Sequence, residues 1–489
     1  MKLIYNTNAT LREMGGKNLA LAATQLLLAV IAATLVVPIT IGNGMSATAA
    51  LFGAGVGTLI YILFTRGKSP VFLGSAHAFV GAMASAFAGG VSMSLGYLGL
   101  LIGALTQGVV MLILAVVVKF CGSKWISRVM PPVVIGPTVA LIGLELASHA
   151  THDLLSGDLS GATGDPLCSP YLALLCGLTA LGVTIALTMF AKKKAIRMIP
   201  FIFGILAAYA LALILSVIGT VSGIDALRVI DFSHFSDLLT DGRVTLSSFL
   251  KLPDFTFLTA FKGEYSYGTH GSMLKYVVAI VLAYAPISFI AFAEHIADHA
   301  HISLIVDRDL LKDPGLSSTL AGDGIGSVIG AFFGGCPNSS YSEAVGCMAI
   351  TGNTSILSIV LASVGAILLS FFSPFVALID SIPNCITGGI CIALYGFVAV
   401  AGLSMMEGKD LEEHRNLFPI AVILITGVGE LSLTLGDITI PPMACALLLG
   451  ILTNLLVTRG KGKLKGEQDA FHTHHEHLAK QHEKPHDGA

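Results

Sequence analysis

Residues 70–89 read PVFLGSAHAFVGAMASAFAG, an apolar segment whose first half, Pro70 to His77, is interrupted by Gly and Ser. Its length suits a membrane span, but these residues do not suit an unbroken helix. A second segment, 336–351, has the same character, with Pro, Asn and Ser between Pro337 and Ser342. Non-helical backbone at membrane depth is tolerated only inside protein or beside a cavity. The two segments therefore predict broken helices that line an internal site.

The composition places the whole chain in a lipid bilayer. Of its 489 residues, 54% are hydrophobic and 12% are charged, and the mean hydropathy is +0.83. Soluble domains carry about 25% charged residues. These values argue against a soluble enzyme, a nucleic-acid-binding protein and a disordered chain. The eight cysteines form no CxxC pair, which favours small buried side chains over disulfides or metal ligands.

Hydropathy predicts fourteen membrane segments, which the long stretch 221–273 divides into two groups of seven. The broken segments come third in each group. An odd number of spans per group gives the two groups opposite orientations. The predicted fold is therefore an all-α polytopic membrane protein of two inverted seven-segment repeats, with segments 3 and 10 broken by short extended pieces. The unbroken segments lie near 18–40, 46–64, 96–118, 131–148, 168–190, 198–220, 274–297, 316–334, 354–374, 380–402, 416–434 and 440–458.

Internal sequence similarity supports the repeat. Residues 131–136 read PPVVIG and residues 383–388 read PNCITG, with the same spacing of Pro and Gly. The alternative is chance, because Gly and Pro interruptions are frequent in membrane helices.

The distribution of basic residues predicts the orientation. With the N-terminus inside, 22 of the 27 Lys and Arg residues lie on the cytoplasmic side. Both termini, 1–17 and the His-rich tail 459–489, are then cytoplasmic, and 221–273 is an external loop. No cleavable signal peptide is recognised, so the first span anchors itself.

Ionisable groups inside a membrane need a function, because each costs about 2.5–3.5 kcal/mol at the centre of a helix. Glu294 and Asp298 are four residues apart and share one helix face. Carboxylates so close together in a membrane hold a proton readily, which suits a proton carrier. The alternative is a solvated helix end at the cytoplasmic surface. The full set of candidates is Glu145, Glu294, Asp298, Asp323, Glu343 and Glu430.

Glu343 follows the interrupted stretch Pro337–Ser342, where a half-helix is expected to begin. A helix start exposes free N–H donors, and the segment around His77 offers the same. Backbone donors beside carboxylate acceptors suit a small, planar, polar molecule that carries both C=O and N–H groups. The alternative for Glu343 is a carboxylate that only stabilises a helix N-terminus.

The histidines offer a different chemistry. His295 and His299 have the spacing to bind a metal with Asp298, but they lack the HExxH pattern. We therefore expect no metal site, and we treat a metal-ion transporter as a lesser alternative. His77 either lines the site or packs as a hydrogen-bonded side chain. No phosphate-binding loop or dinucleotide fingerprint is complete, and the glycines of 53–57 and 322–330 favour close helix packing.

The chain resembles the nucleobase–ascorbate transporter family, and its bacterial uracil permeases in particular. The motifs occur in the family's order over roughly residues 18–458. They are PVFLGSAHAF at 70–79, AEH at 293–295, DLLKDPGL at 309–316, PNSSYSE at 337–343, and the stretch from Pro383 to Gly396.

The resemblance implies a core (transport) domain of 18–120 and 274–375, and a gate domain of 121–220 and 376–458. It implies a homodimer formed through the gate domain, in the plasma (inner) membrane, and no nucleic-acid partner. The core would slide against the gate in an elevator motion coupled to protons, with no cofactor.

The resemblance also implies roles for single residues. Glu294 and Glu343 would bind the polar edge of the nucleobase, and the backbone at His77 and Ser342 would donate to its carbonyls. Tyr395 would cover the site from the gate. Glu294 and Asp298 would carry the coupling proton.

Two positions leave the substrate open. Asp298 stands where uracil permeases have His and purine carriers more often have Asp, whereas Glu343 matches the uracil carriers. His77 and Leu26 also depart from the family pattern, which usually has an aromatic residue and a His there. We expect a uracil:proton symporter, with a xanthine or urate permease as the alternative.

Overall fold

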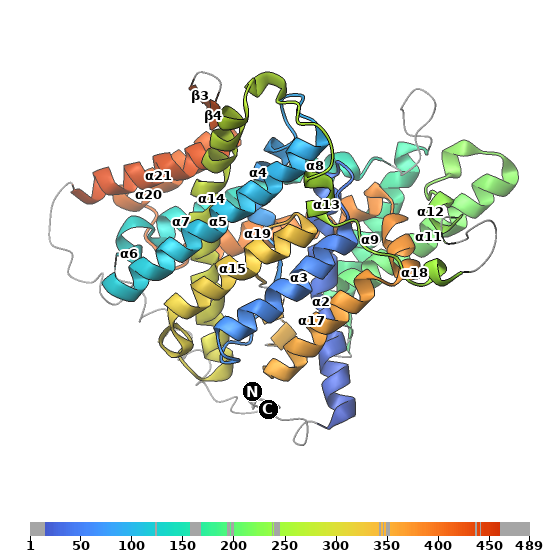
Figure 1. Cartoon of the computed structure of the whole chain (residues 1–489), viewed down its shortest axis with the longest axis horizontal. Coiled ribbons are helices and arrows are strands. Elements are labelled where there is room, and N and C mark those ends of the chain that lie inside the picture. Colours follow the sequence, from blue (N-terminus) through green and yellow to red (C-terminus); the bar gives the residue numbers. More distant parts are fainter. Residues whose placement is uncertain are drawn as a thin grey trace.

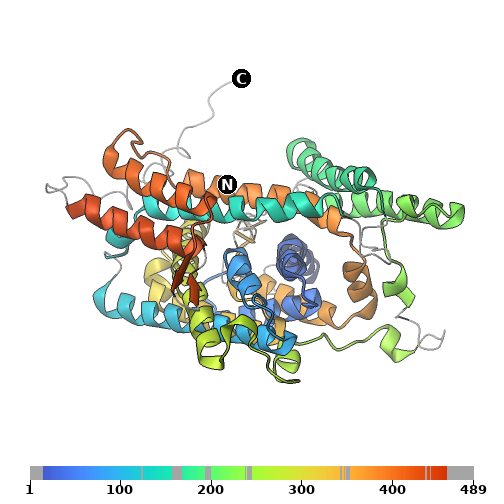
Figure 2. The same ribbon diagram turned by 90° about the horizontal axis from the view of Figure 1, so that it is seen from above.

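The helices form two layers in a computed structural model of the chain (Figures 1 and 2). The structure describes residues 15–122, 125–156, 168–192, 196, 200–236, 238, 245–341, 344–345, 347–348, 353–435, 438–440 and 442–459. The first layer contains α2 (Gly16–Ile41), α3 (Ala47–Phe64), α4 (Val80–Ser85), α5 (Met93–Cys121), α14 (Met273–Val306), α15 (Leu316–Gly334) and α17 (Ile356–Ser370). The second contains α7 (Pro132–Glu145), α8 (Ala147–Asp153), α9 (Pro170–Phe190), α11 (Pro200–Ser222), α19 (Asn384–Ser404), α20 (His414–Val428) and α21 (Pro442–Arg459).

Short elements connect these helices. On the connections lie α6 (Ile126–Val129), α12 (Ser233–Ser236), α13 (Thr256–Ala260), α18 (Ser373–Asp380) and the single turns η2 (Asp225–Leu227), η3 (Leu246–Ser248), η4 (Gly268–His270) and η5 (Leu311–Gly315). The long connection between α11 and α14 contacts the first layer, where Phe255 packs against Phe52 of α3 with ring centroids 5.0 Å apart.

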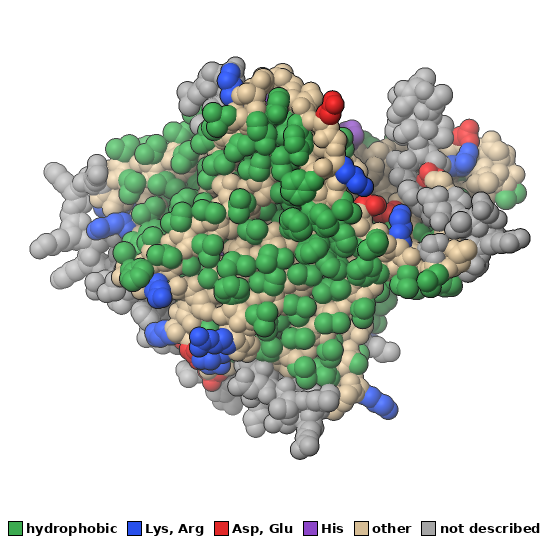
Figure 3. Space-filling model, viewed as in Figure 1, with side chains coloured by type: hydrophobic (Ala, Val, Ile, Leu, Met, Phe, Trp, Pro, Cys, Tyr) green, Lys and Arg blue, Asp and Glu red, His purple; other side chains and the backbone are tan. Residues whose placement is uncertain are grey.

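Nine of the described helices are long and apolar enough to cross a membrane. Three further described helices, α17, α20 and α21, are apolar but shorter. Hydrophobic side chains cover the face formed by α3, α5, α15 and α17, while Lys and Arg gather at its edges (Figure 3). Side chains such as Leu63, Ile113 and Leu368 are more than half exposed on it. An apolar surface of this kind, on helices long enough to cross a membrane, is typical of contact with lipid. The chain is therefore a multi-pass membrane protein.

Glycines bring α3 and α15 into backbone contact. A Cβ added to Gly53 would lie 2.2 Å from the carbonyl oxygen of Gly330, and one added to Gly326 would lie 2.7 Å from that of Gly57. No side chain fits at these distances, so only glycine permits the crossing. The prediction that these glycines serve close helix packing is confirmed.

Two short antiparallel strand pairs complete the described structure. β1 (Leu73–Ser75) pairs with β2 (Asn338–Ser340) inside the first layer, and the sequence predicts extended pieces at both places. β3 (Leu433–Leu435) pairs with β4 (Ile438–Ile440) and was not predicted. Residues 433–440 read LTLGDITI, whose alternation and central Gly-Asp are typical of a hairpin. The predicted span 416–434 is therefore helical only as far as Val428.

The helix that carries Glu294 is longer than the predicted span of 274–297. α14 continues to Val306, so Glu294 and Asp298 lie within the helix and not at its end. Asp298 is 4% exposed and the neighbouring His295 and His299 are fully buried. The alternative of a solvated helix end is therefore wrong for this face of α14.

Candidate functional site

The candidate site is built around the two strands, which satisfy each other's backbone groups deep inside the protein. Leu73 lies opposite Ser340, and Ser75 lies opposite Asn338. Beyond the strands, the Ala76 N–H donates to the Pro337 carbonyl at 2.8 Å. Buried N–H and C=O groups must find partners, and the broken helices supply them to each other. The two interruptions in the sequence therefore form one structural unit.

Thr58 of α3 anchors strand β1 through its hydroxyl group. Its hydroxyl oxygen accepts from the Leu73 N–H at 2.9 Å and lies 3.1 Å from the Leu73 carbonyl oxygen. Directly after β2, the Tyr341 hydroxyl donates to the Ser75 carbonyl at 2.9 Å. These contacts leave the strand pair little freedom relative to α3.

A buried polar network holds strand β2. The Asn338 N–H donates to Ser327 Oγ at 2.8 Å, and Ser327 donates to Gln107 Oε1 at 2.7 Å. The ring of contacts closes when the Gln107 amide donates to the Asn338 carbonyl at 3.2 Å. The Asn338 side chain also donates to the Gly53 carbonyl at 3.1 Å. A fully satisfied network of this kind makes a site rigid.

The chain turns from strand to helix at Ala76, so the η1 turn (His77–Phe79) begins at His77. The first amides of a helix have no partner within it and are available to a ligand. The His77 ring is near both Tyr341 and Tyr395, with centroid distances of 6.2 Å and 6.3 Å. His77 therefore sits where the two layers meet.

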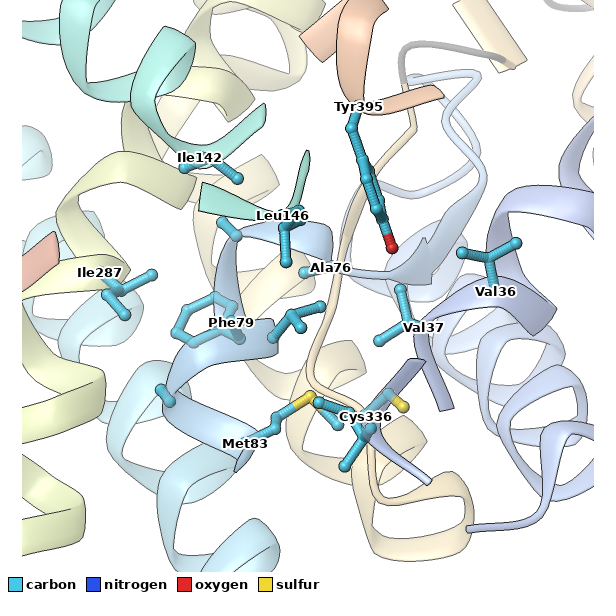
Figure 4. Close-up of a cluster of buried hydrophobic side chains, with 14 of the residues drawn as sticks. Val36, Val37, Ala76, Phe79, Met83, Ile142, Leu146, Ile287, Cys336 and Tyr395 are labelled. Carbon is cyan, nitrogen blue, oxygen red and sulfur yellow. The ribbon is translucent and has the colours of Figure 1, made fainter. Parts of the chain in front are cut away.

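Tyr395 reaches this place from the second layer. It projects from α19 towards the segment that carries Ala76, beside Val37 of α2 (Figure 4). Its hydroxyl lies 3.0 Å from Thr40 Oγ1, also on α2. A buried tyrosine of one layer is thus hydrogen-bonded to the other layer next to the strand pair.

Asp298 connects α14 to the strand pair. Ser340 of β2 donates its hydroxyl proton to Asp298 Oδ2 at 2.8 Å. Glu294 lies one turn earlier on α14 and is half-buried. The structure therefore brings one of the two predicted carboxylates of α14 into contact with β2.

His295 and His299, two of the three histidines of α14, are fully buried and contact other side chains. His295 Nδ1 lies 2.5 Å from Asp323 Oδ2, and its Nε2 lies 3.0 Å from Thr319 Oγ1. His299 Nε2 lies 2.7 Å from the Tyr61 hydroxyl. The described residues contain no group of three or more His, Cys, Asp and Glu side chains placed to hold a metal ion.

The remaining predicted residues differ in their placement. Ser342 and Glu343 lie outside the residues that the structure describes. Glu145 ends α7 and lies against Gly81 of α4, because a Cβ on that glycine would be 3.4 Å from the Glu145 carboxylate. Glu430 is exposed beyond α20. The pairing of Asp323 with His295 was not foreseen, and only an intramembrane Asp marked it in the sequence.

Comparisons with known proteins agree with this architecture. A family model described as "Permease family" matches residues 17–435. The uracil permease of Bacillus subtilis (strain 168) is 30% identical over 458 residues, which are 92% of this chain and 94% of that protein. The uracil permease of Escherichia coli (strain K12) is 31% identical over 434 residues, with 88% and 89% covered.

A solved transporter structure has a similar fold. The transmembrane domain of a cyanobacterium bicarbonate transporter, BicA, aligns with 94% of this chain and 100% of its own, with a TM-score of 0.57. At 15% sequence identity, the likeness concerns the fold alone.

Proposed function

The chain belongs to the nucleobase–ascorbate transporter family, and from this premise we propose that it is a uracil:proton symporter. It is a multi-pass permease and not an enzyme. The observation that carries the proposal is the strand pair β1–β2, which is bound to the intramembrane carboxylate of Asp298 through Ser340. This unit combines the start of a helix with a carboxylate, as a small base with C=O and N–H groups requires.

The proposed binding mode follows from that chemistry. The amides at His77 and Ser342 donate to the carbonyls of uracil, while Glu294 and Glu343 accept from its N–H groups. Tyr395 covers the base from the second layer. The position of His77 at the start of η1, beside Tyr395, supports this arrangement.

Proton coupling is assigned to Glu294 and Asp298. A carboxylate inside a membrane is costly to leave charged, so binding of a proton and of the substrate become linked there. Asp298 is buried and hydrogen-bonded to the substrate-binding strand, which supports its part in this linkage. The coupling ion is a proton, and no other cofactor enters the proposal.

The layers suggest how access alternates. We assign the first layer to the core domain, 18–120 and 274–375, and the second to the gate domain, 121–220 and 376–458. The core would slide against the gate as an elevator, and the gate would form the homodimer contact. The rigid attachment of the strand pair to α3, α5 and α15 supports movement of the core as one body.

Helix packing supports two inverted repeats of seven segments. α15 packs on α5 as α3 packs on α17, and α14 packs on α5 as α2 packs on α17. In the second layer, α9 with α11 corresponds to α20 with α21. In each comparison, the second helix pair is obtained from the first by replacing each helix with the helix at the same position in the other repeat. The antiparallel pairing of β1 and β2 fits the same relation.

The proposed topology has both termini in the cytoplasm of a cell whose plasma (inner) membrane holds the protein. Two connections predicted on the cytoplasmic side do meet. Lys68 lies 2.6 Å from Asp313, and Arg308 donates to the Lys68 carbonyl at 2.5 Å. Lys68 belongs to the connection before β1, whereas Arg308 and Asp313 belong to the connection before α15. Their contact supports placing these two connections on the same side of the membrane.

A xanthine or urate permease is the second candidate, and Asp298 is the observation that favours it. Uptake of labelled uracil into cells that lack their own carrier tests the leading proposal. We expect uptake that excess uracil abolishes and excess xanthine does not. If the protein is present in the membrane without uptake above background, the proposal is wrong. Competition by xanthine alone would favour the second candidate.

A further inference from the structure

The imidazole of His77 has no role in the binding mode above, which uses only its backbone amide. Its Nε2 atom is buried and has no hydrogen-bond partner among the described residues. A buried polar atom left without a partner costs about 1–3 kcal/mol. His77 is the first residue of η1, where backbone amides are available to a ligand, so a bound substrate is a candidate partner for Nε2.

The two tyrosines beside the His77 ring do not use its Nε2 atom as a hydrogen-bond partner. The Tyr341 hydroxyl donates to Ser75, and the Tyr395 hydroxyl pairs with Thr40, so both phenols hydrogen-bond elsewhere. They flank the imidazole as rings, one of them stacked with an interplanar angle of 29° and the other edge-on at 75°. A phenylalanine at position 77 would make similar ring contacts but would lack the polar atom.

We propose that the side chain of His77 determines specificity by donating a hydrogen bond from Nε2 to a carbonyl oxygen of the bound base. A neutral imidazole can carry its proton on Nε2. The amide of the same residue faces a carbonyl in the proposed function, on which this inference rests. His77 would thus supply a side-chain donor to the base in addition to its backbone amide.

The consequence is discrimination against bases in which that oxygen is replaced. Sites built to hydrogen-bond a substrate group reject analogues that leave their own polar atom unpaired. Sulfur is a weaker acceptor than oxygen, so 2-thiouracil and 4-thiouracil probe the two carbonyls separately. Only one of the two positions should be sensitive to the residue at 77.

The experiment is calorimetric titration of the purified protein with uracil, 2-thiouracil and 4-thiouracil. We expect His77→Phe to bind uracil about five- to tenfold more weakly, the value of one neutral hydrogen bond. We also expect it to lose the preference for uracil over one thio analogue. His77→Gln, which keeps an N–H donor, should retain part of both. The control is His270→Phe, because His270 also has a buried ring nitrogen without a partner among the described residues, but on η4.

The outcomes separate this inference from the proposed function. If the wild type binds uracil and His77→Phe binds all three ligands as the wild type does, the inference is wrong. It is also wrong if His77→Phe weakens all three ligands by the same factor, since that pattern indicates a structural role. A wild-type protein that binds none of the three would overturn the proposed function and this inference with it.

Discussion

Ser340 Oγ lies 2.8 Å from Asp298 Oδ2, and this contact joins the second broken segment to the carboxylate of α14. It makes the position of β2 depend on the state of Asp298. A change in the protonation of this carboxylate would alter its hydrogen bond to Ser340, and so affect the strand that we assign to substrate binding.

Removal of this hydroxyl should therefore impair transport. We expect Ser340→Ala to lower the uptake rate about tenfold, because Asp298 loses a buried partner, while Ser340→Thr keeps most of the activity. Ser339→Ala is the matched control, since strand alternation points Ser339 to the opposite face. Initial uptake rates at equal protein levels measure the effect. Wild-type rates in Ser340→Ala would show that the contact has no part in transport.

The crossing of α3 and α15 should tolerate no side chain. In Gly53→Ala the added Cβ would be 2.2 Å from the Gly330 carbonyl oxygen, and a backbone atom cannot move aside cheaply. We expect a loss of about 1–3 kcal/mol or more in stability. Gly182→Ala on α9 is the control, because nothing lies within 4 Å of the new Cβ. Thermal unfolding in detergent compares them, and equal melting temperatures would contradict the packing argument.

Thr58 should be needed for its hydroxyl and not for its shape. Thr58→Val leaves the buried N–H of Leu73 unpaired, at a cost of about 1–3 kcal/mol, and should loosen strand β1. We expect a lower melting temperature and weaker uracil binding. Thr179→Val removes only a bond to the Leu175 carbonyl on an exposed face of α9 and should change neither. An unchanged affinity in Thr58→Val would mean that β1 does not depend on this anchor.

Tyr395 and Thr40 should act as one unit between the layers. Tyr395→Phe and Thr40→Val each remove the same hydrogen bond, so each should weaken binding by a few-fold. The double variant should be no worse than either single one, because the energies of coupled residues do not add. Binding titrations of all four proteins form the cycle. Additive losses would indicate that the contact does not form in the ligand-bound protein.

Much of this architecture can be predicted from the sequence, because polar, proline and glycine residues are unusual inside a membrane and therefore indicate special structure there. Proline and glycine within apolar runs predicted the extended pieces at β1 and β2, and the glycines of 53–57 and 322–330 predicted close helix packing, although not which helices would meet. Hydropathy also located the long helices, since few charges interrupt them. In each of these cases, the local residue types indicate the conformation of the segment, although its partner lies far away in the sequence.

The rest depends on contacts between distant segments. Nothing near Asp323 in the sequence indicates that it binds His295, because α14 and α15 meet only after folding. Ser340 and Gln107 are likewise ordinary polar residues until the network around Asn338 brings them together. The extension of α14 to Val306 was missed because its last turns are less apolar, although the structure buries His299 within them. The roles predicted for Ser342 and Glu343 remain predictions.

The central claim is that uracil and protons move together through the site at β1, β2 and α14. The most direct measurement is uptake of labelled uracil into proteoliposomes, with and without an imposed pH gradient that is acidic outside. We predict accumulation above the external concentration only with the gradient, and its loss in Glu294→Gln. Accumulation that is the same without the gradient, or that survives unchanged in Glu294→Gln, would contradict the account.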